Sequence, residues 1–162
     1  MRLLNLLVPG MALAACAAAL AQTPTYHLGR TPGTEEIRAW DIAIGPEGKE
    51  LPPGRGTAPE GATIYAQKCA ACHGVTGTET NLGYLTRPLV GGKGPRGVAG
   101  WQFATAIWDI INRSMPLRQW GSLSADEVYA LTAFLLHRNG IIQESDVMDA
   151  QSLPKVRMPN RN

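Results

Sequence analysis

The pentapeptide Cys69-Ala70-Ala71-Cys72-His73 constrains this chain more than any other stretch of its sequence. Two cysteines three residues apart lie on one face of a helix, where both thiols can reach the same flat group. A histidine directly after the second cysteine is typical of covalent haem attachment, with the imidazole as the proximal iron ligand. We therefore predict one covalently bound haem c, attached through Cys69 and Cys72 and ligated by His73.

Three other interpretations of a C-x-x-C pair are a redox dithiol, half of a zinc site and a structural disulfide. The dithiol interpretation expects a thioredoxin-like βαβ pattern, and the sequence shows none. A zinc site needs a second pair of cysteines or histidines at ligand spacing, and only His27 and His137 remain. Haem attachment is therefore the favoured interpretation.

Residues 1–21 have the features of a cleaved signal peptide. Arg2 precedes an apolar, alanine-rich run, and Ala19-Leu20-Ala21 forms an A-x-A cleavage site before Gln22. We therefore expect export to the periplasm. The segment Leu13-Ala14-Ala15-Cys16 also resembles a bacterial lipoprotein box, and lipidation of Cys16 would tether the chain to a membrane. Because the apolar run continues beyond this cysteine, we favour secretion without a lipid.

The exported chain divides by composition into an arm at 22–58, a helical domain at 59–140 and a strap at 141–162. Proline and glycine interrupt the arm, so we expect a largely extended segment that packs on the body or on a partner. Disorder is expected around residues 52–56 rather than near Trp40. The strap is expected to be extended, with a short turn at 144–149.

Three helices are predicted in the domain. Thr57 and Glu60 form a capping box for a helix that begins near Pro59, and Gly61 would let another helix approach closely. A second helix spans 103–113 and ends because the residue before a proline is pushed out of the helical region. Its apolar face is Phe103, Ile107, Ile110 and Ile111, with Asp109, Asn112 and Arg113 pointing away.

The third helix, at 125–138, carries the strongest signals. Ser124 and Glu127 form its capping box, and Asn139-Gly140 closes its end. Residues 75–100, by contrast, form a glycine-rich loop that is too long for a compact domain unless it wraps a prosthetic group.

The iron needs a sixth ligand, and Met115 is the preferred candidate. Pro116 holds it in extended backbone after a helix, where its side chain can turn inward. A thioether ligand favours ferrous iron, and it fills the position that oxygen chemistry would use. The alternatives are Met148, Met158, His27 and His137.

Residues 61–138 resemble a class I cytochrome c, an all-α fold of three main helices around one covalent haem. Gly61 and Tyr65 match that family's first-helix contact pair, and Leu131 and Phe134 match the residues that cross them. The segment Arg87-Pro88-Leu89-Val90-Gly91 resembles the family's Gly-Pro-x-Leu-x-Gly loop, with Arg87 in place of the first glycine. The resemblance implies that the Pro88 carbonyl accepts the ring N–H of His73 and that Leu89 contacts the haem.

A narrower resemblance covers nearly the whole exported chain. Four parts of the chain resemble cytochromes that serve molybdenum sulfite or sulfane dehydrogenases: residues 108–116, residues 123–136, the tail 152–161 and the arm motifs at 40–42 and 51–54. This implies an electron-transfer protein that is not an enzyme on its own. Its partners would be a molybdenum sulfite-oxidising subunit and a downstream cytochrome or oxidase, with no nucleic acid.

Other functions remain open at this level. The chain could be a general electron shuttle between another periplasmic dehydrogenase and a terminal oxidase, a haem enzyme with an open sixth position, or a subunit whose haem never cycles. Charge does not decide between them. Residues 68–118 are the basic part of the chain, which can steer an acidic partner or can offset two haem propionates.

Overall fold

The computed structural model describes residues 28–79, 87–91 and 97–161 of the 162-residue chain. The chain divides into two units, residues 1–40 and 41–162. The predicted signal peptide, Cys16 and His27 lie outside the described residues. No helix within the described part is long and apolar enough to cross a membrane.

The first unit contains the helix α2 (Thr34–Trp40), so the expectation of a largely extended arm is wrong for these residues. The side chain of Glu36 accepts the backbone N–H of Gly33, which satisfies one of the free donors at the start of the helix. Glu35 and Glu36 in the first turn and Arg38 in the last turn also suit the helix dipole. None of the helix residues is buried, and the Trp40 side chain is 86% exposed.

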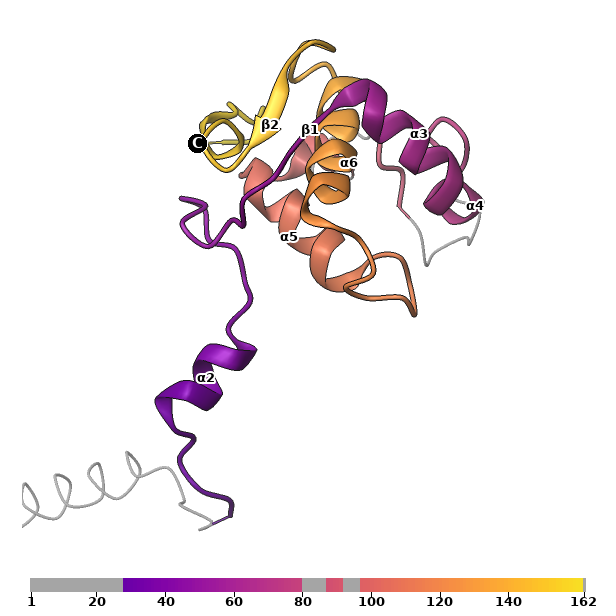
Figure 1. Ribbon diagram of the computed structural model, residues 1–162. Helices are drawn as coiled ribbons and strands as arrows, with labels where there is room; N and C mark the ends of the chain where they lie inside the picture. The colour runs from indigo at the N-terminus through magenta and orange to yellow at the C-terminus, as the bar shows by residue number, and fades with distance from the viewer. Residues whose placement is uncertain (1–27, 80–86, 92–96, 162) are drawn as a thin grey trace, which may run out of the picture. The chain divides into compact units, whose positions relative to one another are not determined.

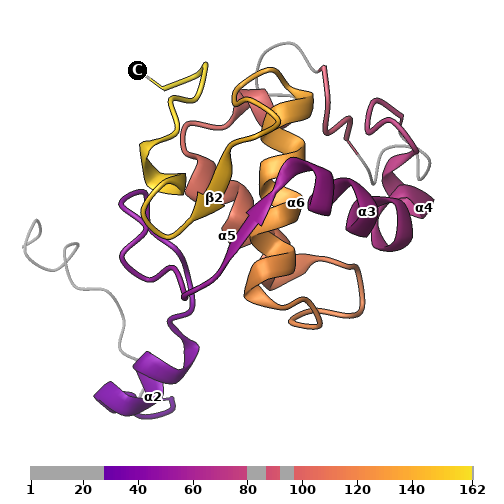
Figure 2. The same cartoon turned by 45° about the horizontal axis from the view of Figure 1, so that its top comes forward.

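The second unit is built around α6 (Ala125–Arg138), which contacts both other long helices and both strands. Figures 1 and 2 show α3 (Ala58–Lys68) and α5 (Ala104–Ser114) against this central helix. The short helix α4 (Ala70–His73) follows α3, and the single turns η2 (Val98–Gly100) and η3 (Leu153–Lys155) complete the helical elements that the described residues contain. Three main helices therefore form the body, as predicted.

The predicted helix boundaries are close to those observed. The third helix has the predicted limits, and Ser124 and Glu127 form the expected capping box. The second helix begins and ends one residue later than predicted. The first begins at Ala58 with the Thr57–Glu60 capping box, and it ends at Lys68 because the backbone turns at Cys69. Capping boxes were sufficient signals for the first and third helices, and apolar periodicity with the following proline was sufficient for the second.

A close approach between α3 and α6 organises the body. A side-chain carbon on Gly61 would lie 2.7 Å from Cβ of Phe134, so glycine is needed at this crossing, as predicted. One turn further along α3, the rings of Tyr65 and Phe134 pack with their centroids 4.9 Å apart. The predicted contact pair on the first helix is therefore confirmed against Phe134.

A two-stranded antiparallel sheet joins the two ends of this unit. Strand β1 (Arg55–Thr57) pairs with β2 (Val147–Asp149), and Gly56 lies opposite Met148. The expectation of disorder around 52–56 is therefore wrong, and the predicted turn at 144–149 is partly a strand. A side-chain carbon on Gly56 would lie 2.3 Å from the Ala130 nitrogen, so this strand also lies directly on α6.

The predicted strap contributes to the hydrophobic core instead of only covering it. Met148, Leu153 and Met158 are all less than 5% exposed. They belong to the same cluster of buried side chains as the faces of α5 and α6. Burying side chains of this size stabilises the fold by about 2 kcal/mol each, so the tail is part of the domain.

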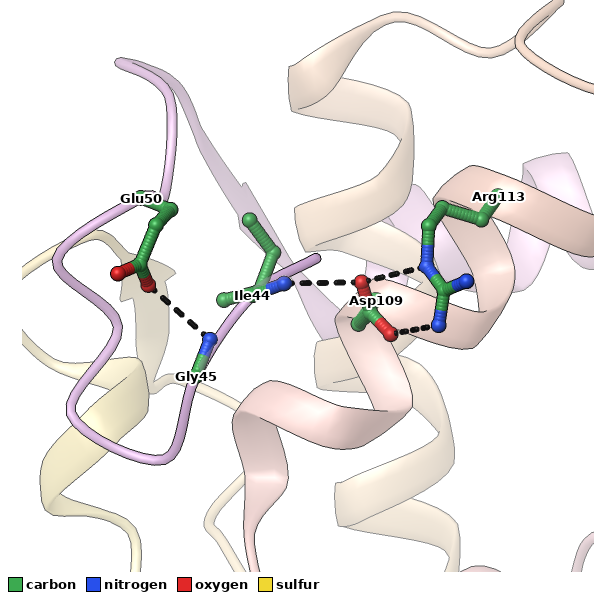
Figure 3. A network of polar contacts seen from close by, with 5 residues as sticks. All are labelled: Ile44, Gly45, Glu50, Asp109 and Arg113. Carbon is green, nitrogen blue, oxygen red and sulfur yellow. Dashed lines mark hydrogen bonds and ion pairs between the residues drawn. The ribbon is translucent and has the colours of Figure 1, made fainter. Parts of the chain in front are cut away.

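The arm packs on the body from Ile44 onward, and its anchor is Asp109 of α5. The carboxylate accepts the backbone N–H of Ile44 at 3.0 Å and also binds the guanidinium of Arg113, as Figure 3 shows. Nearby, Glu50 accepts the backbone N–H of Gly45. Asp109 was predicted to point away from the apolar face of its helix, and nothing in the sequence indicated that the arm covers this carboxylate and leaves it 8% exposed.

Candidate haem site

Cys69 and Cys72 lie at the junction between α3 and α4. The backbone bends at Cys69, and its carbonyl accepts the N–H groups of Cys72 and His73 at 3.1 and 3.0 Å. Cys72 and His73 therefore lie one helical turn after Cys69. Both cysteines are half-buried free thiols, and burial raises the pKa of the Cys69 thiol to about 11.

The Nδ1 atom of the His73 imidazole is buried and has no hydrogen-bond partner in the structure. Burial also lowers the pKa of His73, which favours the neutral ring that can ligate a metal. Buried polar atoms are almost always paired, so an unpaired ring nitrogen next to two free thiols points to a functional group.

The segment after His73 is tightly folded. Gly74 ends α4 with a φ of 80°, and a side-chain carbon there would lie 2.2 Å from the Glu79 carboxylate. The carbonyl of Gly74 accepts the buried hydroxyl of Tyr65 at 2.9 Å. The haem motif is therefore fixed to α3 at both of its ends.

Pro88 and Leu89 lie beside this segment. The carbonyl of Gly77 accepts the backbone N–H groups of Leu89 and Val90 at 2.7 and 3.0 Å. Residues 87–91 are thus held next to the turn that follows His73, as the resemblance implied. The expected hydrogen bond from His73 to the Pro88 carbonyl is not formed here, and it stays a prediction.

Met115 directly follows α5 in extended backbone, with φ and ψ of −124° and 148°, as predicted from Pro116. Its side chain is half-buried and packs against the core. Two alternative methionines, Met148 and Met158, are 4% and 3% exposed within the core cluster, which accounts for them as packing residues.

The structure gives little support to His137 as the sixth iron ligand and does not describe His27. His137 lies in the last turn of α6, and its Nδ1 is 3.4 Å from the Ile142 carbonyl oxygen. His27 lies outside the described residues. Met115 therefore remains the preferred candidate for the sixth position.

Asn139 is a site residue that sequence reasoning assigned only to the end of the third helix. Its side-chain amide donates to the carbonyls of Leu89 and Leu135 at 3.0 and 2.7 Å, and its Oδ1 accepts the N–H of Gly91 at 3.2 Å. An asparagine at a helix end is expected to cap that helix. Nothing in the sequence shows that it also binds a loop about 50 positions earlier.

The residues present fit a haem. Within the described part of the chain, no three histidine, cysteine or acidic side chains form a cluster that could hold a metal ion directly. Two thiols for covalent attachment and one imidazole as an iron ligand instead suit an iron that is already held in a macrocycle, and the Met115 thioether is the candidate for the second ligand. The thiols would form the attachment, and the unpaired imidazole would provide a ligand.

Comparisons with known proteins agree with this geometry. The family model described as "Cytochrome C oxidase, cbb3-type, subunit III" matches residues 56–135, which include the cysteine motif and the candidate methionine. Thiosulfate dehydrogenase of Stutzerimonas stutzeri (strain A1501) is 32% identical over 108 residues. That match covers 59% of this chain and 35% of the relative, so the chain spans about a third of that protein.

A solved structure is similar over a larger share. A chain in the crystal structure of the sulfane dehydrogenase SoxCD from Paracoccus pantotrophus shares 34% sequence identity, with a TM-score of 0.69. The match covers 84% of this chain and 70% of that chain. An all-α fold, a C-x-x-C-H motif on a short helix and these matches lead to one conclusion: the chain belongs to the class I cytochrome c family, whose members carry covalently bound haem c.

Proposed function

We propose that this chain transfers single electrons as the haem subunit, or the direct electron acceptor, of a periplasmic molybdenum enzyme that oxidises sulfite. The observation that carries the proposal is the likeness to a chain of a sulfane dehydrogenase structure over 84% of the sequence. That share exceeds residues 56–135, which the cytochrome family model matches. The likeness therefore extends beyond the haem domain, into regions that a freely diffusing shuttle does not need.

Within this proposal, Cys69 and Cys72 hold the haem covalently, while His73 and Met115 ligate its iron. Bound haem supplies reversible one-electron chemistry. The chain's own contribution would be to provide both iron ligands, His73 and Met115, from partly buried side chains. Pro88 would accept the ring N–H of His73, which fixes the ring orientation, and Leu89 would contact the haem.

Electrons would enter and leave near the segments that flank these two ligands. Leu117 and Trp120 follow the methionine and are 60% and 69% exposed, and Val75 follows the histidine at 82% exposure. Exposed apolar side chains of this size beside both proposed ligands would suit a contact with another protein. Arg118, between Leu117 and Trp120, and Arg87, at the start of the loop 87–91, are exposed bases that would favour an acidic partner surface.

The test is rapid mixing of the haem-loaded ferric protein with sulfite, with and without the candidate molybdenum enzyme. We expect fast haem reduction only when the enzyme is present. Thiosulfate replaces sulfite in a parallel arm, because one relative is a thiosulfate dehydrogenase. Comparable reduction by sulfite alone, or reduction only in the thiosulfate arm, would overturn the sulfite assignment.

A general shuttle to a terminal oxidase is the main alternative, and co-purification separates it from a subunit. Affinity purification from the native host should recover a molybdenum-containing protein in constant ratio to the haem. A haem enzyme would instead show an open sixth position in its ferric spectrum. Downstream, a cytochrome or oxidase should reoxidise the ferrous protein.

The proposed location is the periplasm, reached through a cleaved signal peptide at residues 1–21. Mass spectrometry of the exported protein should find Gln22 as the first residue. A lipidated Cys16 at the N-terminus would instead place the chain on a membrane surface.

A further inference from the structure

We propose that Asn139 is a positioning residue for the axial histidine and acts through the loop at 87–91. This inference rests on the proposed ligation of iron by His73 and deepens it. In the structure, Asn139 joins the end of α6 to a loop that is distant in sequence, through hydrogen bonds to Leu89 and Gly91. The same loop contains Pro88, the proposed acceptor for the histidine ring.

The first step of the argument concerns the direction of the Pro88 carbonyl. This carbonyl belongs to the same peptide unit as the N–H of Leu89, and in a trans peptide the two groups point in opposite directions. The Leu89 N–H donates to Gly77 at 2.7 Å. The orientation of the Pro88 carbonyl is therefore fixed by that hydrogen bond, and the carbonyl points away from Gly77.

The second step concerns the next peptide unit. Its N–H, on Val90, also donates to Gly77, and its carbonyl, on Leu89, accepts the Asn139 amide at 3.0 Å and the Val98 N–H at 3.2 Å. Gly77 thus holds one edge of the loop, and Asn139 holds the opposite edge. Without the asparagine amide, the Val98 N–H alone would hold this edge of the loop. The loop could then shift relative to α6, and the Pro88 carbonyl would move with it.

The third step concerns the histidine itself. Nδ1 of His73 is buried without a partner, so it needs an acceptor from the surrounding chain when it donates its proton. A ligating histidine depends on such an acceptor for its ring orientation and its basicity. Asn139 would therefore influence the iron through two intermediates, the loop and the imidazole, and without touching either ligand.

A purely structural role is the alternative, because Asn139 also caps α6 through its bond to the Leu135 carbonyl at 2.7 Å. Exchange of the His73 ring proton separates the roles, because the end of α6 keeps a backbone bond in every variant. Asn139→Ala and Asn139→Gly both remove the side-chain bonds to the loop and to Leu135, but the backbone N–H of residue 139 still donates to the Leu135 carbonyl at 3.2 Å. Asn160→Ala is the matched control, because its amide also donates to a backbone carbonyl, that of Gly100 in η2 at 2.8 Å.

The readout is the exchange rate of the His73 ring proton with solvent, measured by NMR on the haem-loaded ferric protein. We expect exchange to be about 10- to 30-fold faster in both Asn139 variants, and changed by less than about twofold in Asn160→Ala. Unchanged exchange in Asn139→Gly, or equal acceleration in Asn160→Ala, would overturn the inference. If the wild-type protein shows no iron-shifted imidazole proton, His73 ligation itself fails, and this inference fails with it.

Discussion

The carbonyl oxygen of Ala130 on α6 occupies the position that a side chain on Gly61 would need. A side-chain carbon built on Gly61 would lie 2.0 Å from that oxygen, which is far inside van der Waals contact. The obstacle is helix backbone, which cannot rotate aside as a flexible side chain can. The crossing of α3 over α6 therefore depends on the absence of a single methyl group, and this crossing places the cysteine motif at the end of α3.

Replacing Gly61 by alanine should destabilise the protein by about 3 kcal/mol, at the upper end of the cost of overpacking a core. The two helices would have to separate, which disturbs the packing of Tyr65 on Phe134 as well. Chemical denaturation of the haem-loaded protein measures the change. Gly33→Ala is the control, because its added carbon meets nothing closer than 3.7 Å. Equal stabilities for the two variants would contradict the close-packed crossing.

Met115 and Met158 should respond differently to replacement by leucine. Met115→Leu removes the proposed thioether ligand, so the sulfur-to-iron absorption band should disappear and the reduction potential should fall. Met158→Leu should keep the band, because this side chain is 97% buried in the core and a leucine of similar volume costs less than about 1.5 kcal/mol there.

Absorption spectra of the two ferric proteins provide the measurement, and potentiometric titration provides the second readout. A band that survives in Met115→Leu and is lost in Met158→Leu would reverse the ligand assignment. A band that is absent from the unmodified protein would instead support an open or different sixth position.

Asp109 should make stability depend on pH. Burial alone would raise its pKa, but the hydrogen bonds from Arg113 and Ile44 outweigh burial, so the pKa lies below the ordinary 3.8. A carboxylate with a lowered pKa stabilises the fold above pH 3.8, and this contribution is lost as the pH falls through the lowered folded-state value. Asp109→Asn should therefore cost about 1 to 2 kcal/mol at pH 7.

The difference between Asp109→Asn and the unmodified protein should shrink as the pH falls from 3.8 through the lowered folded-state pKa, because the unfolded chain takes up its proton first and folded Asp109 is neutralised only at the end of this range. Urea denaturation at several pH values measures it. Asp41→Asn removes an exposed carboxylate from the same stretch of arm and serves as the control. A stability gap that is constant over this range would show that the charge of Asp109 has no role.

The parts of the fold that could be predicted from the sequence are those with local signals. Capping boxes mark α3 and α6, and an apolar period ended by Pro116 marks α5, so the Ser124–Glu127 box located α6 without tertiary information. The pairing of Gly56 with Met148 could not be found in this way. Three-residue strands have too little pattern, and their partner lies about 90 positions further along the chain.

The candidate site divides in the same way. Cys69, Cys72 and His73 are adjacent in the sequence, and Pro116 marks Met115 directly. Asn139 was not found, because its partners in the loop are close only after α6 has packed on the rest of the body. The burial of Asp109 was likewise hidden, since it depends on the arm that covers α5.

The arm should have two separable roles along its length. Removing residues 22–40 should leave the free energy of unfolding unchanged, because no residue of α2 is buried. Removing residues 22–50 should cost about 2 kcal/mol, since it also removes the Ile44 hydrogen bond to a charged carboxylate. Denaturation of both truncated proteins, exported behind a foreign signal peptide, measures this.

If the arm contacts the proposed molybdenum partner, the shorter deletion should still weaken that complex, because it removes the exposed Ile37 and Trp40. Unchanged affinity together with full stability would show that residues 22–40 serve neither folding nor that partner.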